Sequence, residues 1–101
     1  MRPFSCESKK ISVSNLVTMH PSVLLGVQIG TDSANDPTVT IYNGSDNNGE
    51  ELVPTCTYDA SALGLNGVNT AYGKKAENGI YVEITCSGTV EVIVDYLVMN
   101  K

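Results

Sequence analysis

The sequence has no tryptophan and only one histidine and one phenylalanine among its 101 residues. A general base that works near neutral pH is most often a histidine, so a serine or cysteine nucleophile would depend on His20 alone. His20 precedes Pro21, which favours an extended backbone before it and indicates a bend. We therefore expect His20 to be a surface turn residue. The chain carries no nucleophile signature, and we predict that it is not an enzyme.

Charged residues are also scarce, at 17% of the chain with a formal net charge of −5. The basic residues include two doublets, Lys9-Lys10 and Lys74-Lys75, but no stripe. Because binding to nucleic acid requires clustered cations, we expect no nucleic-acid partner. No run approaches the roughly 18 apolar residues of a membrane span, and the N-terminal residues lack the apolar stretch of a secretion signal. We expect no membrane partner and folding in a cytoplasm.

The three cysteines, Cys6, Cys56 and Cys86, are widely spaced and form no CxxC pair. Zinc sites use paired ligand spacings, which this arrangement lacks. An odd number of cysteines does not form a complete disulfide framework. We expect free thiols, with Cys56 and Cys86 packing inside strands as small apolar residues. A metal or disulfide role is the alternative.

Glycine, serine, threonine, asparagine and β-branched residues are plentiful, a composition typical of short strands and tight turns. The length suits one domain. Residues 1–10 are polar and predict an N-terminal arm, and residues 11–101 predict a single β-sandwich domain. Two runs, residues 11–19 and 22–30, alternate apolar and polar positions and form either two strands or one bent strand. Their predicted inward positions are Ile11, Val13, Val17, Met19, Val23, Leu25, Val27 and Ile29.

Residues 38–58 predict a hairpin with a long polar tip at residues 43–51, where two Asn-Gly pairs favour turns. Its inward residues include Val39 and Ile41. Residues 59–79 are irregular, with a strand expected at residues 68–71 and one helical turn at residues 60–63.

Residues 80–96 predict a second hairpin, in which two alternating runs flank a turn at Ser87-Gly88. Strands with one apolar face require a second layer to cover them. Six to eight short strands therefore predict an all-β fold, a small antiparallel β-sandwich that is jelly-roll-like or immunoglobulin-like.

Three acidic residues of the second hairpin, Glu83, Glu91 and Asp95, are candidates for cross-strand neighbours. A glycosidase places two carboxylates close together in a cleft, so such a pair is one interpretation. On an outward face they are more simply solvating charges that guard sheet edges, and this is our prediction.

Two loops contain oxygen ligands that suit calcium: Asp46–Glu51, and Asp32 with Asn35 and Asp36. Neither has the spacing of an EF-hand. We predict turns at both loops, with weak calcium binding as the alternative. We assign no catalytic, cofactor-binding or metal-binding residue and expect no cofactor.

The segment PTVTIYNGSDNNGEEL, followed later by ENGIYVEITCSGTVEVIVDYL, resembles a class of small bacteriophage virion structural proteins. In that class a strand ending T-V-x-[IL]-Y-[DN]-G precedes a polar turn, and a G-[IL]-Y-V strand precedes a final T-x-V-x-V-x-Y strand. The similarity covers residues 22–98. It implies a jelly-roll-like or immunoglobulin-like sandwich of the capsid decoration, cement or head-fibre type, with no enzymatic residues.

The resemblance implies a protein that decorates or cements the capsid surface through protein-protein contacts with the major capsid protein or another virion protein. We expect a homo-oligomer, located in the virion and assembled in the host cytoplasm, in which residues 1–10 reach a neighbouring subunit. One alternative is a carbohydrate- or receptor-binding module of a head fibre or tail. An exposed tyrosine pair near residues 43–50 would favour it, but the tyrosines are dispersed along the sequence. A cytosolic bacterial sandwich of unrelated role is another alternative.

Overall fold

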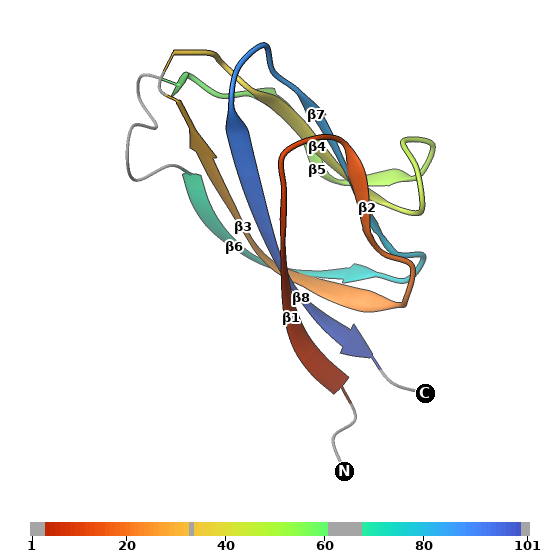
Figure 1. The fold of residues 1–101 in the computed structure, drawn as a ribbon. Helices are drawn as coiled ribbons and strands as arrows, with labels where there is room; N and C mark the ends of the chain where they lie inside the picture. Colours follow the sequence, from red (N-terminus) through yellow and green to blue (C-terminus); the bar gives the residue numbers. More distant parts are fainter. Residues whose placement is uncertain (1–3, 33, 61–67, 100–101) are drawn as a thin grey trace.

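The computed structural model of the chain describes residues 4–32, 34–60 and 68–99. Within those ranges, eight strands form two four-stranded sheets that face each other (Figure 1). The strands are β1 (Phe4–Ile11), β2 (Asn15–Thr18), β3 (Ser22–Thr31), β4 (Thr38–Asn43), β5 (Glu50–Thr57), β6 (Val68–Ala76), β7 (Ile80–Thr85) and β8 (Val90–Met99). The described part of the chain contains no helix long and apolar enough to cross a membrane.

The strand order is β1-β8-β3-β6 in the first sheet and β2-β7-β4-β5 in the second, and neighbouring strands are antiparallel. Only β4 and β5 are consecutive strands of the same sheet; every other connection leads to the opposite sheet. An immunoglobulin sandwich places its first two strands side by side in one sheet, whereas β1 and β2 lie in different sheets. The predicted β-sandwich is confirmed, and its strand order is that of a jelly roll.

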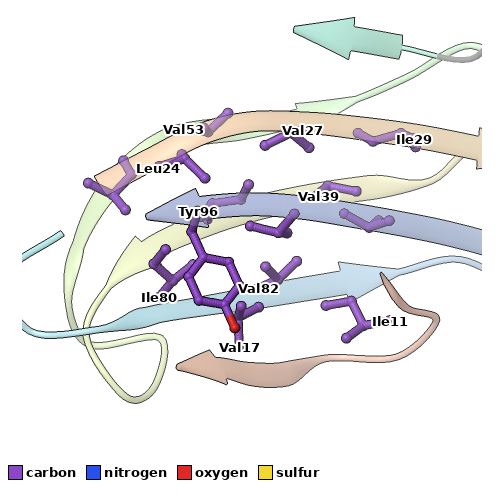
Figure 2. Close-up of a cluster of buried hydrophobic side chains, with 14 of the residues drawn as sticks. Ile11, Val17, Leu24, Val27, Ile29, Val39, Val53, Ile80, Val82 and Tyr96 are labelled. Carbon is purple, nitrogen blue, oxygen red and sulfur yellow. The ribbon is translucent and has the colours of Figure 1, made fainter. Parts of the chain in front are cut away.

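The core lies between the sheets, and both contribute alternate residues of their strands to it (Figure 2). The predicted inward residues Val39 and Ile41 on β4 are 1% and 0% exposed. They pack in the same cluster as Leu24 of β3 and Val94 of β8, which are both 0% exposed. Burial of each such aliphatic side chain contributes about 1.5–3 kcal/mol, so this layer is the main source of stability.

The predicted hairpin of residues 80–96 is wrong. Strand β7 pairs with β2 and β4, whereas β8 pairs with β1 and β3 in the opposite sheet. The four-residue connection between them is tied to the loop after β3, because Thr89 N donates to Asp32 Oδ2 at 3.1 Å and Asp32 N donates to Thr89 O at 3.2 Å. Because β7 and β8 lie in opposite sheets, the apolar faces of both strands point into the core between the sheets.

The N-terminal segment also differs from the expectation. Residues 4–10, predicted as part of an arm, belong to β1, which pairs with β8 along its length. The run predicted for residues 11–19 is interrupted after Ile11, and only Asn15–Thr18 forms a strand. Val13 and Met19 lie beside β2 at bends and are 67% and 68% exposed, so their predicted inward position is wrong. The bend at His20–Pro21 separates two strands of different sheets.

A β-bulge explains the error within β3. The register of β3 against both neighbours shifts between Leu24 and Gly26. Ser22 and Leu24 point inward before the shift, and Val27 and Ile29 after it, while Val23 and Leu25 are only half-buried. A bulge adds one residue and reverses the alternation, so a strict period of two assigned Val23 and Leu25 to the wrong face.

The remaining predictions for strands have clearer outcomes. The hairpin of residues 38–58 is confirmed as β4 and β5, joined by the polar loop of residues 44–49. The strand expected at residues 68–71 is longer, because β6 continues to Ala76. The helical turn expected at residues 60–63 falls mostly outside the described residues.

A lysine bridges the two sheets at each open side of the sandwich. On one side Lys9 of β1 donates from Nζ to Leu16 O of β2 at 3.2 Å. On the other side Lys74 of β6 donates from Nζ to Leu52 O of β5 at 2.8 Å. The four strands involved are the edge strands of their sheets. Charged side chains at edges discourage unwanted strand pairing, so these lysines both close and protect the edges.

Candidate functional site

The outer face of the second sheet carries aromatic, hydroxyl and carboxylate side chains. Because Val39 and Ile41 of β4 and Val82 of β7 face the core, the alternate positions of these strands face outward. We call this surface the tyrosine face; its members are Thr38, Thr40 and Tyr42 of β4, Tyr81 and Glu83 of β7, Thr55 and Thr57 of β5, and Asn47 of the β4–β5 loop.

Two tyrosines form the centre of the tyrosine face. Tyr42 of β4 and Tyr81 of β7 are directly opposite in the register of the two strands. Their ring centroids are 6.5 Å apart and the ring planes are tilted by 42°. Both side chains are half-buried. Paired aromatic residues on neighbouring strands stabilise a sheet, and they also offer amphipathic ring surfaces to a ligand.

A carboxylate beside the tyrosine pair is held in place from two sides. The Tyr42 hydroxyl donates to Glu83 Oε1 at 3.2 Å, and Asn47 Nδ2 donates to Glu83 Oε2 at 3.2 Å. Partial burial raises the pKa of the Tyr42 hydroxyl, and the negative charge of Glu83 adds to this effect. Asn47 belongs to the β4–β5 loop, so this contact ties the loop to the sheet. The result is an oriented carboxylate next to two aromatic rings.

Threonine pairs extend the tyrosine face along β4 and β5. The hydroxyls of Thr40 and Thr55 are 2.7 Å apart, and those of Thr38 and Thr57 are also 2.7 Å apart. Each pair links opposite strands by a hydrogen bond. Thr40 is 2% exposed, whereas Thr55 and Thr57 are exposed. These residues form a polar strip next to the tyrosines.

The three candidate carboxylates of residues 80–96 are separated by the fold. Glu83 lies on the outer face of the second sheet, but Glu91 and Asp95 lie on β8 in the first sheet. Glu91 is 3.6 Å from Lys10 Nζ, and Asp95 accepts a hydrogen bond from Ser8 Oγ at 2.6 Å. The interpretation of cross-strand neighbours that include Glu83 is therefore wrong. Glu91 and Asp95 are exposed charges next to an edge strand.

In the loop after β3, the carboxylate of Asp32 orders the backbone by accepting hydrogen bonds from amide groups. Asp32 Oδ1 accepts hydrogen bonds from the backbone amides of Ala34 at 2.9 Å and Asn35 at 3.1 Å, and Oδ2 accepts one from Thr89 N. Hydrogen bonds from the amides of Ala34 and Thr89, the largest causes, lower the pKa of Asp32 to about 2. Its carboxylate thus fixes the junction between β3 and β8, as predicted for a turn.

The loop Asp46–Glu51, predicted as a turn with weak calcium binding as the alternative, is also organised by its own side chains. Asp46 Oδ1 accepts a hydrogen bond from Asn48 N at 2.9 Å, which is a turn within the loop. Asp36, which belongs to the loop after β3, accepts a hydrogen bond at Oδ1 from Ala60 N at 2.9 Å. Across the three described ranges, no three or more His, Cys, Asp or Glu side chains gather as ligands for a metal ion.

His20 and the three cysteines are also candidate functional residues from the sequence. His20 is exposed at the bend before Pro21, as predicted. All three cysteines are free. Cys86 is half-buried and packs against the core as a small apolar residue, as predicted, but it follows β7 and does not lie inside a strand. Cys56 is exposed, so the same prediction for it is wrong.

The tyrosine pair is the feature that the sequence did not reveal. Each tyrosine alternates with inward apolar residues, so an outward position for both follows from the pattern. Their proximity depends on the pairing of β4 with β7, which are far apart in the chain and are not joined by a hairpin. Comparisons with models of protein families, with curated proteins and with solved structures found no match to this chain.

Proposed function

We propose that the protein is a non-enzymatic virion structural protein that decorates or cements a bacteriophage capsid through protein-protein contacts. The observation that carries the proposal is the strand order β1-β8-β3-β6 and β2-β7-β4-β5. This is the order of a jelly roll, a fold used by viral capsid domains and by lectins. The resemblance of residues 22–98 to small phage virion proteins supports the same conclusion.

The surfaces best suited to such contacts are on the first sheet. Its edge strands β1 and β6 each pair on one side only, and Lys9 and Lys74 protect these edges, so we expect contacts with a neighbouring chain on the outer face. Its outer face carries half-buried aliphatic residues, including Ile93 and Leu97 of β8. Val23 of β3 is opposite Leu97, so these two side chains form an apolar patch, and the exposed Asp95 lies between Leu97 and Ile93. Docking of this face against the major capsid protein, or against a second copy in a homo-oligomer, would bury the patch.

Sedimentation velocity tests the proposal. The full chain is sedimented alone and then mixed with expanded capsids from the phage that encodes it, assembled without this protein. We expect co-sedimentation at a fixed stoichiometry and a higher melting temperature of the coated particles. Capsids that already carry the protein serve as the control and should take up none. A chain that stays free at saturating concentration contradicts the proposal.

A further inference from the structure

We propose that the tyrosine face is a binding site for an uncharged oligosaccharide, with Tyr42 and Tyr81 stacking on sugar rings and Glu83 and Asn47 binding hydroxyl groups. The inference does not depend on a place in a virion, because it rests on the outer face of the second sheet alone. The juxtaposition that carries it is a pair of aromatic rings beside a carboxylate whose orientation is fixed.

The rings supply an apolar surface of the right kind. The C–H groups of a pyranose ring pack on aromatic faces, and tyrosine provides such a face together with a polar end. The centroids of Tyr42 and Tyr81 are 6.5 Å apart, a separation that lets each ring contact a different sugar of one chain. Because the rings are tilted by 42°, they do not lie on one plane. A single soluble chain can follow this tilt, whereas a flat crystalline polysaccharide cannot contact both rings.

The neighbouring polar groups retain unused hydrogen-bonding capacity. An ionised carboxylate can accept about four hydrogen bonds. Glu83 accepts one at Oε1 from Tyr42 and one at Oε2 from Asn47, which orient the group without filling it. Asn47 keeps its side-chain carbonyl and a second N–H for a ligand. Adjacent hydroxyl groups of a sugar can therefore donate to Glu83 and exchange hydrogen bonds with Asn47.

The charge of the surface selects against acidic ligands. Strands β2, β4, β5 and β7 contain no lysine or arginine, and Lys9 and Lys74, which reach these strands from the first sheet, bind backbone carbonyl groups of the edge strands. Their charged residues are Glu50, Glu51 and Glu83. Glu51 is opposite Tyr42 in the register of β4 and β5, so a second negative charge lies close to the rings. A sulfated, phosphorylated or sialylated sugar would be repelled, so the expected ligand is an uncharged chain.

The first sheet provides an internal contrast. Its outer face also presents carboxylates, but Glu91 is 3.6 Å from Lys10 and Asp95 is bonded to Ser8. The described residues of β8 and β3 on this face include no aromatic side chain, because Tyr96 of β8 points into the core. Glu91 is therefore a matched control for Glu83: the same residue type on an outward strand position, away from the tyrosine pair.

Titration calorimetry with the full chain tests the site. The probes are tetrasaccharides of glucose, galactose, mannose and N-acetylglucosamine, with a sulfated tetrasaccharide as the acidic comparison. We expect saturable binding of at least one uncharged probe and none of the sulfated probe. Tyr81→Ala should weaken binding by about tenfold or more, which corresponds to about 1.4 kcal/mol or more. Glu83→Gln should also weaken binding, whereas Glu91→Gln should bind as the unmodified chain does.

Thermal melting of each variant separates lost binding from lost folding. Glu83→Gln changes no ring and little volume, so it tests the site even if Tyr81→Ala is unstable. Absence of binding to every uncharged probe, a preference for the sulfated probe, or full affinity in a folded Glu83→Gln variant would overturn the inference. Capsid binding that is lost in Tyr81→Ala, without any sugar binding, would reassign the tyrosine face to a protein partner.

Discussion

Leu24 of the first sheet and Ile41 of the second are both 0% exposed, yet the outward residues of the two sheets differ in kind. The first sheet has half-buried aliphatic side chains and carboxylates paired with lysine or serine. The second has a tyrosine pair, threonine pairs and an oriented glutamate. Both inner faces must be apolar because they pack in one core, whereas the residue types of the outer faces are not restricted in this way and can differ between the sheets. Four predictions test this comparison.

The largest effects should come from the shared core. Leu24→Ala and Ile41→Ala should each lower the free energy of unfolding by about 2–5 kcal/mol, because both leave a cavity among packed side chains. Urea denaturation measures the loss. Similar values would support equivalent inner faces. A loss below about 1 kcal/mol for either variant, typical of a surface position, would break the comparison.

Substitution by alanine should destabilise the protein at one glycine, Gly79, but not at another, Gly73. Gly79 has a φ of 110°, and a Cβ added there would lie 2.6 Å from Thr18 O. Gly79→Ala should cost about 1–3 kcal/mol through backbone strain and this contact. Gly73 of β6 has no atom within 4 Å of such a Cβ, so Gly73→Ala should be neutral or slightly stabilising. Thermal melting of both variants provides the test, and equal losses would contradict it.

Acid should act on the first sheet through Asp32. Its pKa is lowered to about 2 in the folded chain by amide hydrogen bonds, so the folded state binds its proton less readily than the unfolded state. The stability from Asp32 is present above about pH 4 and is lost as the pH falls towards about 2. Acid titration of unfolding should detect this loss, and Asp32→Asn should remove it. An unchanged acid profile in the variant would contradict the assignment.

The smallest effect should come from alkali, which should act on the second sheet through Tyr42. Its pKa is raised above the ordinary value of 10.0, first by burial and then by Glu83. The folded state therefore holds this proton more tightly, and the resulting stability is lost as the pH rises through the raised pKa. An NMR titration of the Tyr42 ring measures the shift. Glu83→Gln should reduce the shift without abolishing it, because burial is the larger cause.

Much of the fold could be predicted from the sequence because strand alternation is local. The inward positions of Val39 and Ile41 and the hairpin of residues 38–58 follow from neighbouring residues and turn chemistry. The prediction failed where one extra residue changes the outcome. At the bulge near Leu25 the alternation reverses, and the isolated Gly26 beside it is a local signal that a strict period of two ignores.

The candidate site could be predicted only in part. The pattern indicates that Tyr42 and Tyr81 both face outward. Glu83 was a candidate only as a possible cross-strand neighbour of other carboxylates in residues 80–96. Which strands lie side by side depends on contacts between residues distant in the chain. The assumed hairpin of residues 80–96 placed Glu83 beside the wrong strand, whereas its contacts are with Tyr42 and Asn47.

Neighbouring positions of the sequence are enough to predict short strands with one apolar face each, because the period of two and the turn-forming residues are local features. The sheet that each strand joins depends instead on tertiary contacts. A connection such as that before Val90 is compatible with a hairpin or with a crossing between sheets. The choice is made by burial of all the apolar faces in one core, and it brings Tyr42 and Tyr81 together on the outside.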